Sequence, residues 1–504
     1  MSGTTELLDA QILQNAIGGV QSQLNETSIW KNKWFILANV CVGTFMATLD
    51  GSIANVALPT MSHALHVHLQ EIQWVVTAYL LTICAWLPIV GKLADMFGRG
   101  RLYNFGFLVF AMGSALCALS GSYVWLILSR ILQAFGASLL MANSQAIVSS
   151  TFPGSERGRA LGVTGAMVSV GSLTGPALGG ILIAAFGWSS IFWINVPIGV
   201  LGFLVGTQTF RRQTKRQLET NYFDWAGSML FMIAIISLLY TVSNADTWGW
   251  GSELTLLGFF ISIVAWVLFV WRQLRASQPV VDLRLYKINA FRAGSIAALL
   301  SFVSLFCTNV LMPFYLEGVL HLDTRVTGYT MAAYPLTMAL VAPFSGWLSD
   351  RIGPLFLTTG GLCVNALGFA LLNTLGLYER AISVALLLAM FGLGQGMFQS
   401  PNNSSVMGAV PRERLGTAGG LNALVRNIGM ILGITLSVSL LSWRLHQMTG
   451  KIVPVGAQIS QPMDFLAALH TVFWSASAVC VLGALFSITR AGARNQKLSS
   501  AEAR

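Results

Sequence analysis

Fourteen apolar runs follow one another along the chain, and each can cross a lipid bilayer as a helix. A helix needs about 20 predominantly apolar residues to span the hydrocarbon core. Transmembrane β-strands are excluded, because they would read as alternating segments of about 10 residues. The pattern therefore predicts an all-α polytopic membrane protein. We expect spans near residues 34–58, 73–91, 102–120, 124–150, 160–185, 189–209, 225–243, 254–271, 292–316, 328–348, 355–376, 382–408, 416–441 and 467–489.

The composition supports this interpretation. Only 10% of the 504 residues are charged and 55% are hydrophobic, whereas about 25% of the residues of a soluble domain are charged. A soluble enzyme, a disordered chain and a free nucleic-acid-binding protein are excluded. The six cysteines have neither zinc-site nor disulfide spacing, so we expect small buried apolar side chains at Cys41, Cys84, Cys117, Cys307, Cys363 and Cys480.

The basic residues predict the orientation of the helices. Of the 29 Lys and Arg residues, all but six fall in the terminal segments or in loops on one side. The positive-inside rule makes that side cytoplasmic and places both termini there. The net charge of +10 is therefore a topology signal, and no nucleic-acid partner is expected. The six exceptions are Arg325, Arg380, Arg444 and Lys451 on the other side, with Arg130 and Arg426 inside spans.

An internal repeat divides the chain into two halves. The segment Gly91–Gly98 (GKLADMFG) recurs 255 residues later as 346–353 (GWLSDRIG), and Gly136 recurs 258 residues later as Gly394. Parallel six-span repeats are typical of transporters. We expect a cytoplasmic N-terminal segment (1–33), a six-helix bundle (34–210), a linker with two additional transmembrane helices (211–290), a second six-helix bundle (291–490) and a cytoplasmic tail (491–504).

Asp50 is the clearest acid within a span. A charge there costs about 2.5–3.5 kcal/mol on insertion scales, so such a residue normally faces a cavity. Desolvation penalises the ionised carboxyl group, which suits it to taking up and releasing protons. The alternative is a structural acid that pairs two helices.

Arg130 and Arg426 are the two basic residues within spans, and each can tune a nearby acid or anchor a helix through backbone carbonyl groups. Glu317 ends the ninth span near the outer face. It is either a second titrating or cation-attracting group or, as we expect, a solvated helix end.

The fifth span contains closely spaced small residues. Gly171, Gly175 and Gly179 follow the small-xxx-small pattern that permits close helix contact, Gly180 follows directly, and Pro176 is expected to kink the helix. Ordinary helix packing is the simplest interpretation. A contact of this kind between the two halves would have to break and reform during transport.

Other chemistry finds little support. His63, His66 and His68 cluster in the first outer loop, where a solvated loop is a better interpretation than a metal site. The sequence contains no P-loop and no nucleophile triad. We therefore expect no enzyme activity, no metal and no cofactor, and a proton gradient as the driving force.

Four motifs resemble those of the major facilitator superfamily, and within it the fourteen-span drug:proton antiporter (DHA2) group of bacterial multidrug efflux proteins. They are Leu49–Pro59 in span one, Gly91–Arg101 between spans two and three, Arg130–Ser138 in span four and Gly171–Gly180 in span five. The resemblance covers residues 34–490.

The resemblance implies roles for individual residues. Asp95 would help to latch the cytoplasmic gate, together with Gly91, Gly98, Arg99 and the repeated pair Asp350 and Arg351. Asn55 and Gln133 would join Asp50, Arg130, Glu317 and Arg426 in proton coupling or substrate binding. The loop at 443–465 is shorter than in relatives that work with a periplasmic adaptor, so we expect no adaptor, and we expect a monomer.

We therefore predict a multi-pass protein of the bacterial inner membrane that exports amphipathic small molecules in exchange for protons by alternating access. In a second reading the cargo is an anionic or lipid-like metabolite, and Arg130 and Arg426 are its counter-ions. A third reading, a non-transporting sensor or scaffold, is disfavoured by the short loops.

Overall fold

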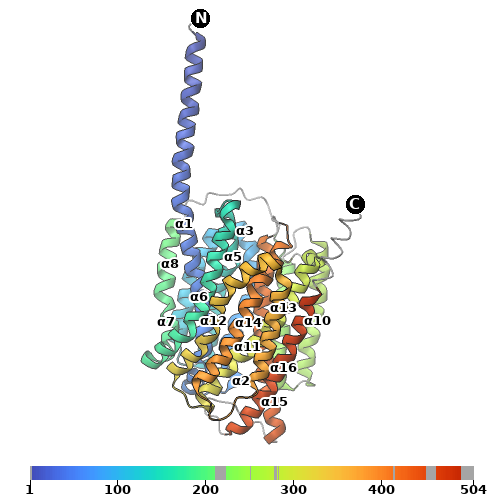
Figure 1. Ribbon diagram of the computed structural model, residues 1–504. Helices are drawn as coiled ribbons and strands as arrows, with labels where there is room; N and C mark the ends of the chain where they lie inside the picture. The colour runs from blue at the N-terminus through green and yellow to red at the C-terminus, as the bar shows by residue number, and fades with distance from the viewer. Residues whose placement is uncertain are drawn as a thin grey trace.

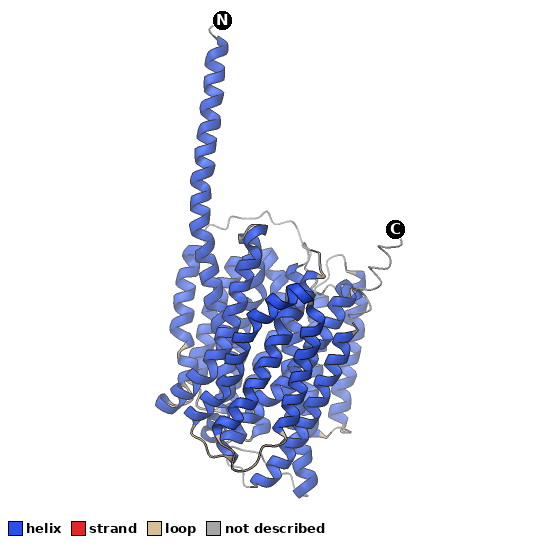
Figure 2. Cartoon of the chain, in the orientation of Figure 1, coloured by secondary structure: helices blue, strands red, loops and turns tan. Residues whose placement is uncertain are grey.

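The computed structural model describes residues 3–210, 223–249, 251–276, 281, 283–411, 415–449 and 461–489. Throughout these residues the chain is helical and contains no strand (Figures 1 and 2). Fourteen helices in this part are long and apolar enough to cross a membrane. The predicted all-α fold with fourteen spans is confirmed.

The first half of the chain supplies six spans. Short helices precede the second span and begin the sixth. The elements are α1 (Gly3–Leu65), α2 (Leu69–Ile72), α3 (Trp74–Phe97), α4 (Arg99–Ala118), α5 (Tyr123–Thr151), α6 (Gly154–Phe186), α7 (Ser190–Trp193) and α8 (Asn195–Thr209).

Two further spans, α9 (Trp225–Trp248) and α10 (Glu253–Arg275), precede the second half and pack on each other. The second half again supplies six spans. Its elements are η1 (Leu283–Lys287), α11 (Asn289–Phe314), η2 (Tyr315–Val319), α12 (Thr324–Ile352), α13 (Pro354–Leu372), α14 (Ala381–Gly408), α15 (Leu415–Thr449) and α16 (Pro462–Ile488).

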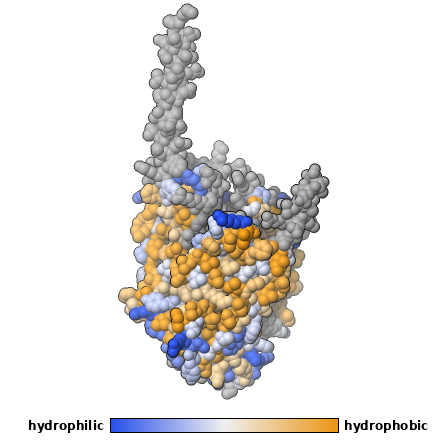
Figure 3. Space-filling view, viewed as in Figure 1, coloured by the Kyte–Doolittle hydropathy of each residue, from blue (hydrophilic) through white to orange (hydrophobic). Residues whose placement is uncertain are grey.

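Large apolar side chains cover the outside of the bundle. Leu340 is 71% exposed and Phe356 is 74% exposed, and Phe344 is exposed beside them on α12. Figure 3 shows hydrophobic residues across the middle of the visible face, with hydrophilic residues gathered toward the ends. Soluble proteins rarely expose an apolar surface of this extent, so lipid is its natural surrounding.

The backbone repeats special conformations in the two halves. Gly98, between α3 and α4, has φ +98°, and Gly353, between α12 and α13, has φ +87°. Glycine reaches this region without the clash of a Cβ atom. His66 and His321 both have φ +54°, a region in which histidine is enriched. Each histidine lies 255 residues from its counterpart, as the two loop motifs do.

The structure differs from the sequence-based expectation in three details. Residues 3–32, which we expected to form a separate N-terminal segment ahead of the first span, continue α1 as one helix that projects beyond the bundle (Figure 1). The sixth span is divided between α7 and α8, because Pro197 has no N–H to bond to the carbonyl group of Trp193. Cys363 is exposed, whereas the other five cysteines are buried.

Candidate functional site

Asp50 lies in a closed polar network inside the N-terminal half. Its side chain is fully buried. Arg130 donates from Nη1 to Asp50 Oδ2 at 2.6 Å. Gln133 and Asn195 donate from their amide groups to Oδ1 at 2.8 and 2.9 Å. We expected this carboxylate to face a cavity. Instead, its oxygens are occupied by three donors from two other helices.

The local structure explains how these donors converge. Arg130 and Gln133 are three residues apart on α5 and therefore share one face of the helix. Asn195 is the first residue of α8, directly after the break that Pro197 introduces. Sequence analysis missed Asn195. Its signal was an amide residue inside an apolar run, two positions before a proline.

The Nε and Nη1 atoms of the Arg130 guanidinium have hydrogen-bond partners. Its Nε donates to the carbonyl oxygen of Val75 at 2.9 Å, and its guanidinium carbon lies 4.2 Å from the centre of the Tyr79 ring. Only Nη2 is buried without a partner. Leaving a buried ion pair without one of its partners is strongly destabilising. Proton uptake at Asp50 would therefore reorganise several helices at once.

Three of the residues predicted for proton coupling or substrate binding lie outside this network. They are Asn55, Glu317 and Arg426, which is on α15. Asn55 donates to the carbonyl oxygen of Gly51 on its own helix. Glu317 sits in the π-helical turn η2, which follows Pro313, and its Oε1 atom is buried without a partner. The expectation of a solvated Glu317 is wrong, because this turn carries the side chain back into the bundle. π-Helical turns are frequent at functional sites.

The glycines of the fifth span bring α6 against α1. A Cβ atom on Gly171 would lie 2.9 Å from the carbonyl oxygen of Phe45, and one on Gly179 would lie 2.8 Å from the Ile53 side chain. Ser52 Oγ donates to the carbonyl oxygen of Gly171 at 3.2 Å. The helix that carries Asp50 is thus packed tightly along α6.

The other side of α6 meets the C-terminal half at α12. A Cβ atom on Gly180 would lie 2.8 Å from the carbonyl oxygen of Thr324, and one on Gly328 would lie 2.5 Å from that of Pro176. We call this contact the α6–α12 seam. Gln70 and Ser442 add a 2.9 Å hydrogen bond between α2 and α15. Both contacts lie at the end where α1 finishes and α12 begins, so the halves are closed there.

The predicted gate residues surround the turns at Gly98 and Gly353. Arg351 is exposed and stacks over the Trp347 ring at 4.1 Å. Arg99 has an interaction partner, and a Cβ atom added to Gly91 would have no neighbour within 4 Å. The side chains of Asp95 and Asp350 lie outside the described residues.

A second ion pair joins two helices near this end of the bundle. Lys33 donates to Glu156 at 2.6 Å, and Lys33 is buried although it begins the first span. Sequence analysis treated Lys33 only as a topology marker. The ion pair links the starts of two neighbouring spans, α1 and α6.

The C-terminal half has an uncharged network on the helices that correspond to α1, α4 and α5. Ser301 on α11 donates to Gln395 Oε1 on α14 at 2.9 Å, and Asn365 on α13 donates to the same oxygen at 3.4 Å. All three residues are buried. The packing of the two halves is similar, whereas only the N-terminal half places a carboxylate there.

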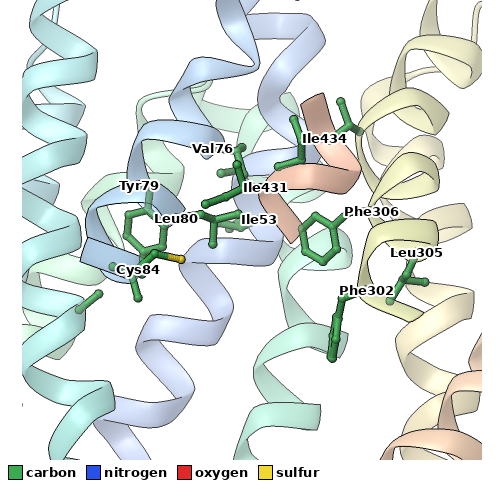
Figure 4. Packing of buried hydrophobic residues seen from close by; sticks show 14 of the residues in the cluster. Ile53, Val76, Tyr79, Leu80, Cys84, Phe302, Leu305, Phe306, Ile431 and Ile434 are labelled. Atoms are coloured by element: carbon green, nitrogen blue, oxygen red, sulfur yellow. The ribbon is translucent and has the colours of Figure 1, made fainter. Parts of the chain in front are cut away.

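Apolar residues fill the region between the halves. Figure 4 shows Ile53 and Val76 of the N-terminal half facing Ile431, Ile434 and Phe306 of the C-terminal half. A separate cavity of about 480 Å³ lies within the C-terminal half, between α11, α15 and α16. Its lining includes Ser304, Cys307, Ser437, Trp443 and Ser475.

Two bundles of six spans that meet along a glycine seam, around charged residues buried at membrane depth, define a polytopic transporter of small molecules rather than an enzyme. The Major Facilitator Superfamily profile matches residues 40–434. The chain belongs to the Major Facilitator Superfamily. The resemblance seen in the sequence motifs is confirmed at this level.

The relatives of this chain include a riboflavin transporter and drug-resistance proteins. The riboflavin transporter RibZ of Clostridioides difficile (strain 630) is 36% identical, covering 91% of this chain and 97% of that protein. The multidrug resistance protein Stp of Mycobacterium tuberculosis is 33% identical, covering 80% and 74%. The tetracenomycin C resistance and export protein of Streptomyces glaucescens is 29% identical, covering 82% and 76%.

Solved structures support the fold. An auto-inhibited peptide transporter of the POT family superposes with a TM-score of 0.66 at 18% identity, covering 92% of this chain and 96% of that chain. At this identity the similarity shows the fold alone.

Proposed function

We propose that this protein is a proton-coupled antiporter that exports amphipathic small molecules from the cytoplasm by alternating access. The observation that carries the proposal is the buried network around Asp50, the only group in the described N-terminal spans with a carboxylate and an arginine in direct contact. The names of the relatives Stp and the tetracenomycin C export protein support a drug-like cargo.

Protonation of Asp50 is the switching event. Neutralising the carboxylate removes the charge that holds Arg130. The arginine then keeps only uncharged contacts, which are Val75, Gln133 and the rings of Tyr79 and Phe192. Arginine does not release its own proton under these conditions. The freed positive charge therefore disfavours the present packing of α1 on α5 and biases the bundle toward another arrangement.

The helix contacts transmit this change to the gate. Asp50 and Ser52 lie on α1, which is packed along the glycines of α6, and α6 forms the seam with α12. A displacement of α1 therefore reaches the contact between the halves through one intermediate helix. Proton uptake and opening of the seam become linked steps.

The remaining features complete the proposal. We infer from the positive-inside asymmetry that both termini are cytoplasmic and that the closed α6–α12 seam faces outward. The proton gradient drives export, no cofactor is needed, and one chain works without an adaptor. In this state the transporter is closed on the outer side, so Asp50 receives its proton from outside only after the seam opens.

The test is Asp50→Asn in proteoliposomes with an imposed pH gradient. Riboflavin and a xanthene dye such as rhodamine 6G serve as trial cargoes. Wild type should couple cargo movement to proton flux, and the variant should retain cargo exchange without proton flux. Glu71→Gln, an outer-surface carboxylate substitution, is the matched control. Cargo-driven proton flux that is unchanged in Asp50→Asn would refute the proposal.

A second candidate, transport of riboflavin, rests on the 36% identity to RibZ over nearly the whole chain. Direct measurement of riboflavin movement in the same vesicles separates this cargo from drugs. Saturable riboflavin transport that rhodamine 6G does not inhibit would favour it.

A further inference from the structure

Arg426 is the charged residue that the Asp50 network leaves unexplained. It lies on α15, about 12 Å along the helix from the start of the span at Ala418, at 1.5 Å per residue. Arginine keeps its positive charge in this setting. The ion pairs found in the described part of the chain are Lys33–Glu156, Arg130–Asp50 and Arg272–Asp224, and none includes Arg426.

Among the residues that the structure describes, Arg426 also makes no side-chain hydrogen bond. Its Nε atom is buried without a hydrogen bond, and the neighbouring Asn427, only 2% exposed, has an unpartnered Nδ2 atom. An unpaired charge at membrane depth is expensive, and such residues normally face a partner or a cavity. Arg130, the other intramembrane arginine, differs from Arg426 because the Asp50 carboxylate neutralises its charge.

The neighbours of α15 show where Arg426 points. At 100° per residue, Arg426 projects between Gly419 and Asn422 on one face of the helix. A Cβ atom on Gly419 would meet the Gln145 side chain of α5. Asn422 donates to Asn403 of α14 at 2.8 Å. Arg426 therefore faces the junction of α5, from the N-terminal half, with α14 of the C-terminal half, and its side chain is half-buried.

We propose that Arg426 is a substrate-binding residue that receives a carboxylate or another oxyanion of an amphipathic cargo between the two halves. The proposal rests on the antiporter function and narrows its cargo. Asp50 is already saturated by Arg130, Gln133 and Asn195, so it offers no free acceptor to a cationic cargo in this state. The unpaired, partly accessible positive charge at Arg426 selects an anion instead.

The test measures binding without transport. Two xanthene dyes of similar shape and opposite charge, fluorescein (anionic) and rhodamine 6G (cationic), are titrated by fluorescence anisotropy against the full chain in nanodiscs. Wild type should prefer fluorescein. Arg426→Gln should weaken fluorescein binding at least tenfold and leave rhodamine 6G binding unchanged or tighter. Arg426→Lys should retain part of the preference.

The melting temperature is a second readout, and it distinguishes a ligand-binding arginine from a structural one. An arginine waiting for a ligand is unpaired, so Arg426→Gln should leave the melting temperature of the ligand-free protein unchanged or higher. Arg444→Gln on the same helix, a half-buried position whose Nη1 donates to Gln447, is the matched control.

Three results would overturn the assignment: wild type without fluorescein binding, equal weakening of both dyes by Arg426→Gln, or a melting temperature lowered by that substitution. These measurements use no pH gradient, so they are independent of the Asp50→Asn experiment. Loss of proton coupling with intact dye selectivity, or the reverse, tells the two proposals apart.

Discussion

The α6–α12 seam should set the balance between the conformations of the transporter, and Gly328→Ala tests this directly. The added Cβ atom would lie 2.5 Å from the carbonyl oxygen of Pro176 and 3.1 Å from the Cα atom of Gly180. Ordinary contacts of a Cβ atom begin near 3.4 Å, so the two helices must separate by most of an ångström. Overpacking of this kind costs about 1–3 kcal/mol.

That cost applies only to the conformation in which the seam is closed. The higher helix propensity of alanine, about 1 kcal/mol relative to glycine, acts on every helical conformation alike and cancels between them. Gly328→Ala should therefore shift the closed-to-open equilibrium by about 5- to 150-fold toward the open state. Transport should slow, because the cycle must return through the closed seam.

Pulsed electron paramagnetic resonance measures the shift. Spin labels are placed at Phe186→Cys and Val326→Cys, two exposed positions at the ends of α6 and α12. Cys363→Ser removes the one exposed native cysteine. Gly328→Ala should move the distance distribution toward longer separations. Gly165→Ala on α6, where a Cβ atom meets nothing within 4 Å, is the control. Identical distributions in the two alanine variants would refute the reasoning.

Three further predictions concern the polar networks. Asn195→Ala removes a hydrogen bond to the buried Asp50 carboxylate and should cost about 1.5–3 kcal/mol, measured as a lower melting temperature. Arg130→Met should cost about 3–5 kcal/mol, because it leaves the Asp50 charge buried and unpaired; adding Asp50→Leu should restore most of the melting temperature without restoring coupling. Ser301→Ala removes the shorter of the two hydrogen bonds to Gln395 Oε1 and should lower stability by about 1 kcal/mol while the pH dependence of transport stays unchanged. A displaced pH profile in that last variant would contradict an uncharged role for the C-terminal network.

The spans and the position of Asp50 within one of them could be predicted from the sequence, because a bilayer imposes length and polarity on each helix separately. It was insufficient for the difference between Arg130 and Arg426. Both are arginines in apolar spans, and each has an amide residue within three positions. Whether a carboxylate reaches the guanidinium depends on which helices pack together, and Asp50 lies 80 residues from Arg130. Asn195 was missed for the same reason, since its role follows from a break in the sixth span.

The internal repeat gives both halves similar helix packing, whereas within the described residues the buried pair of Asp50 and Arg130 has no counterpart in the C-terminal network. Gly106 and Gly136 bring α4 and α5 together, and Gly361 and Gly394 do the same for α13 and α14, each with a Cβ position within about 3 Å of the opposite backbone. These contacts depend on shape, so two halves of one architecture require them equally. A proton site has no such requirement. In the proposed mechanism, one buried carboxylate is sufficient to couple the cycle. A second carboxylate at the position of Ser301 would add a desolvation penalty without a counter-ion, because α14 offers no arginine there. Because the C-terminal network around Gln395 holds no carboxylate, that half can carry the unpaired charge of Arg426. On the two proposals made above, Arg426 selects the cargo and the Asp50 network of the other half handles the proton.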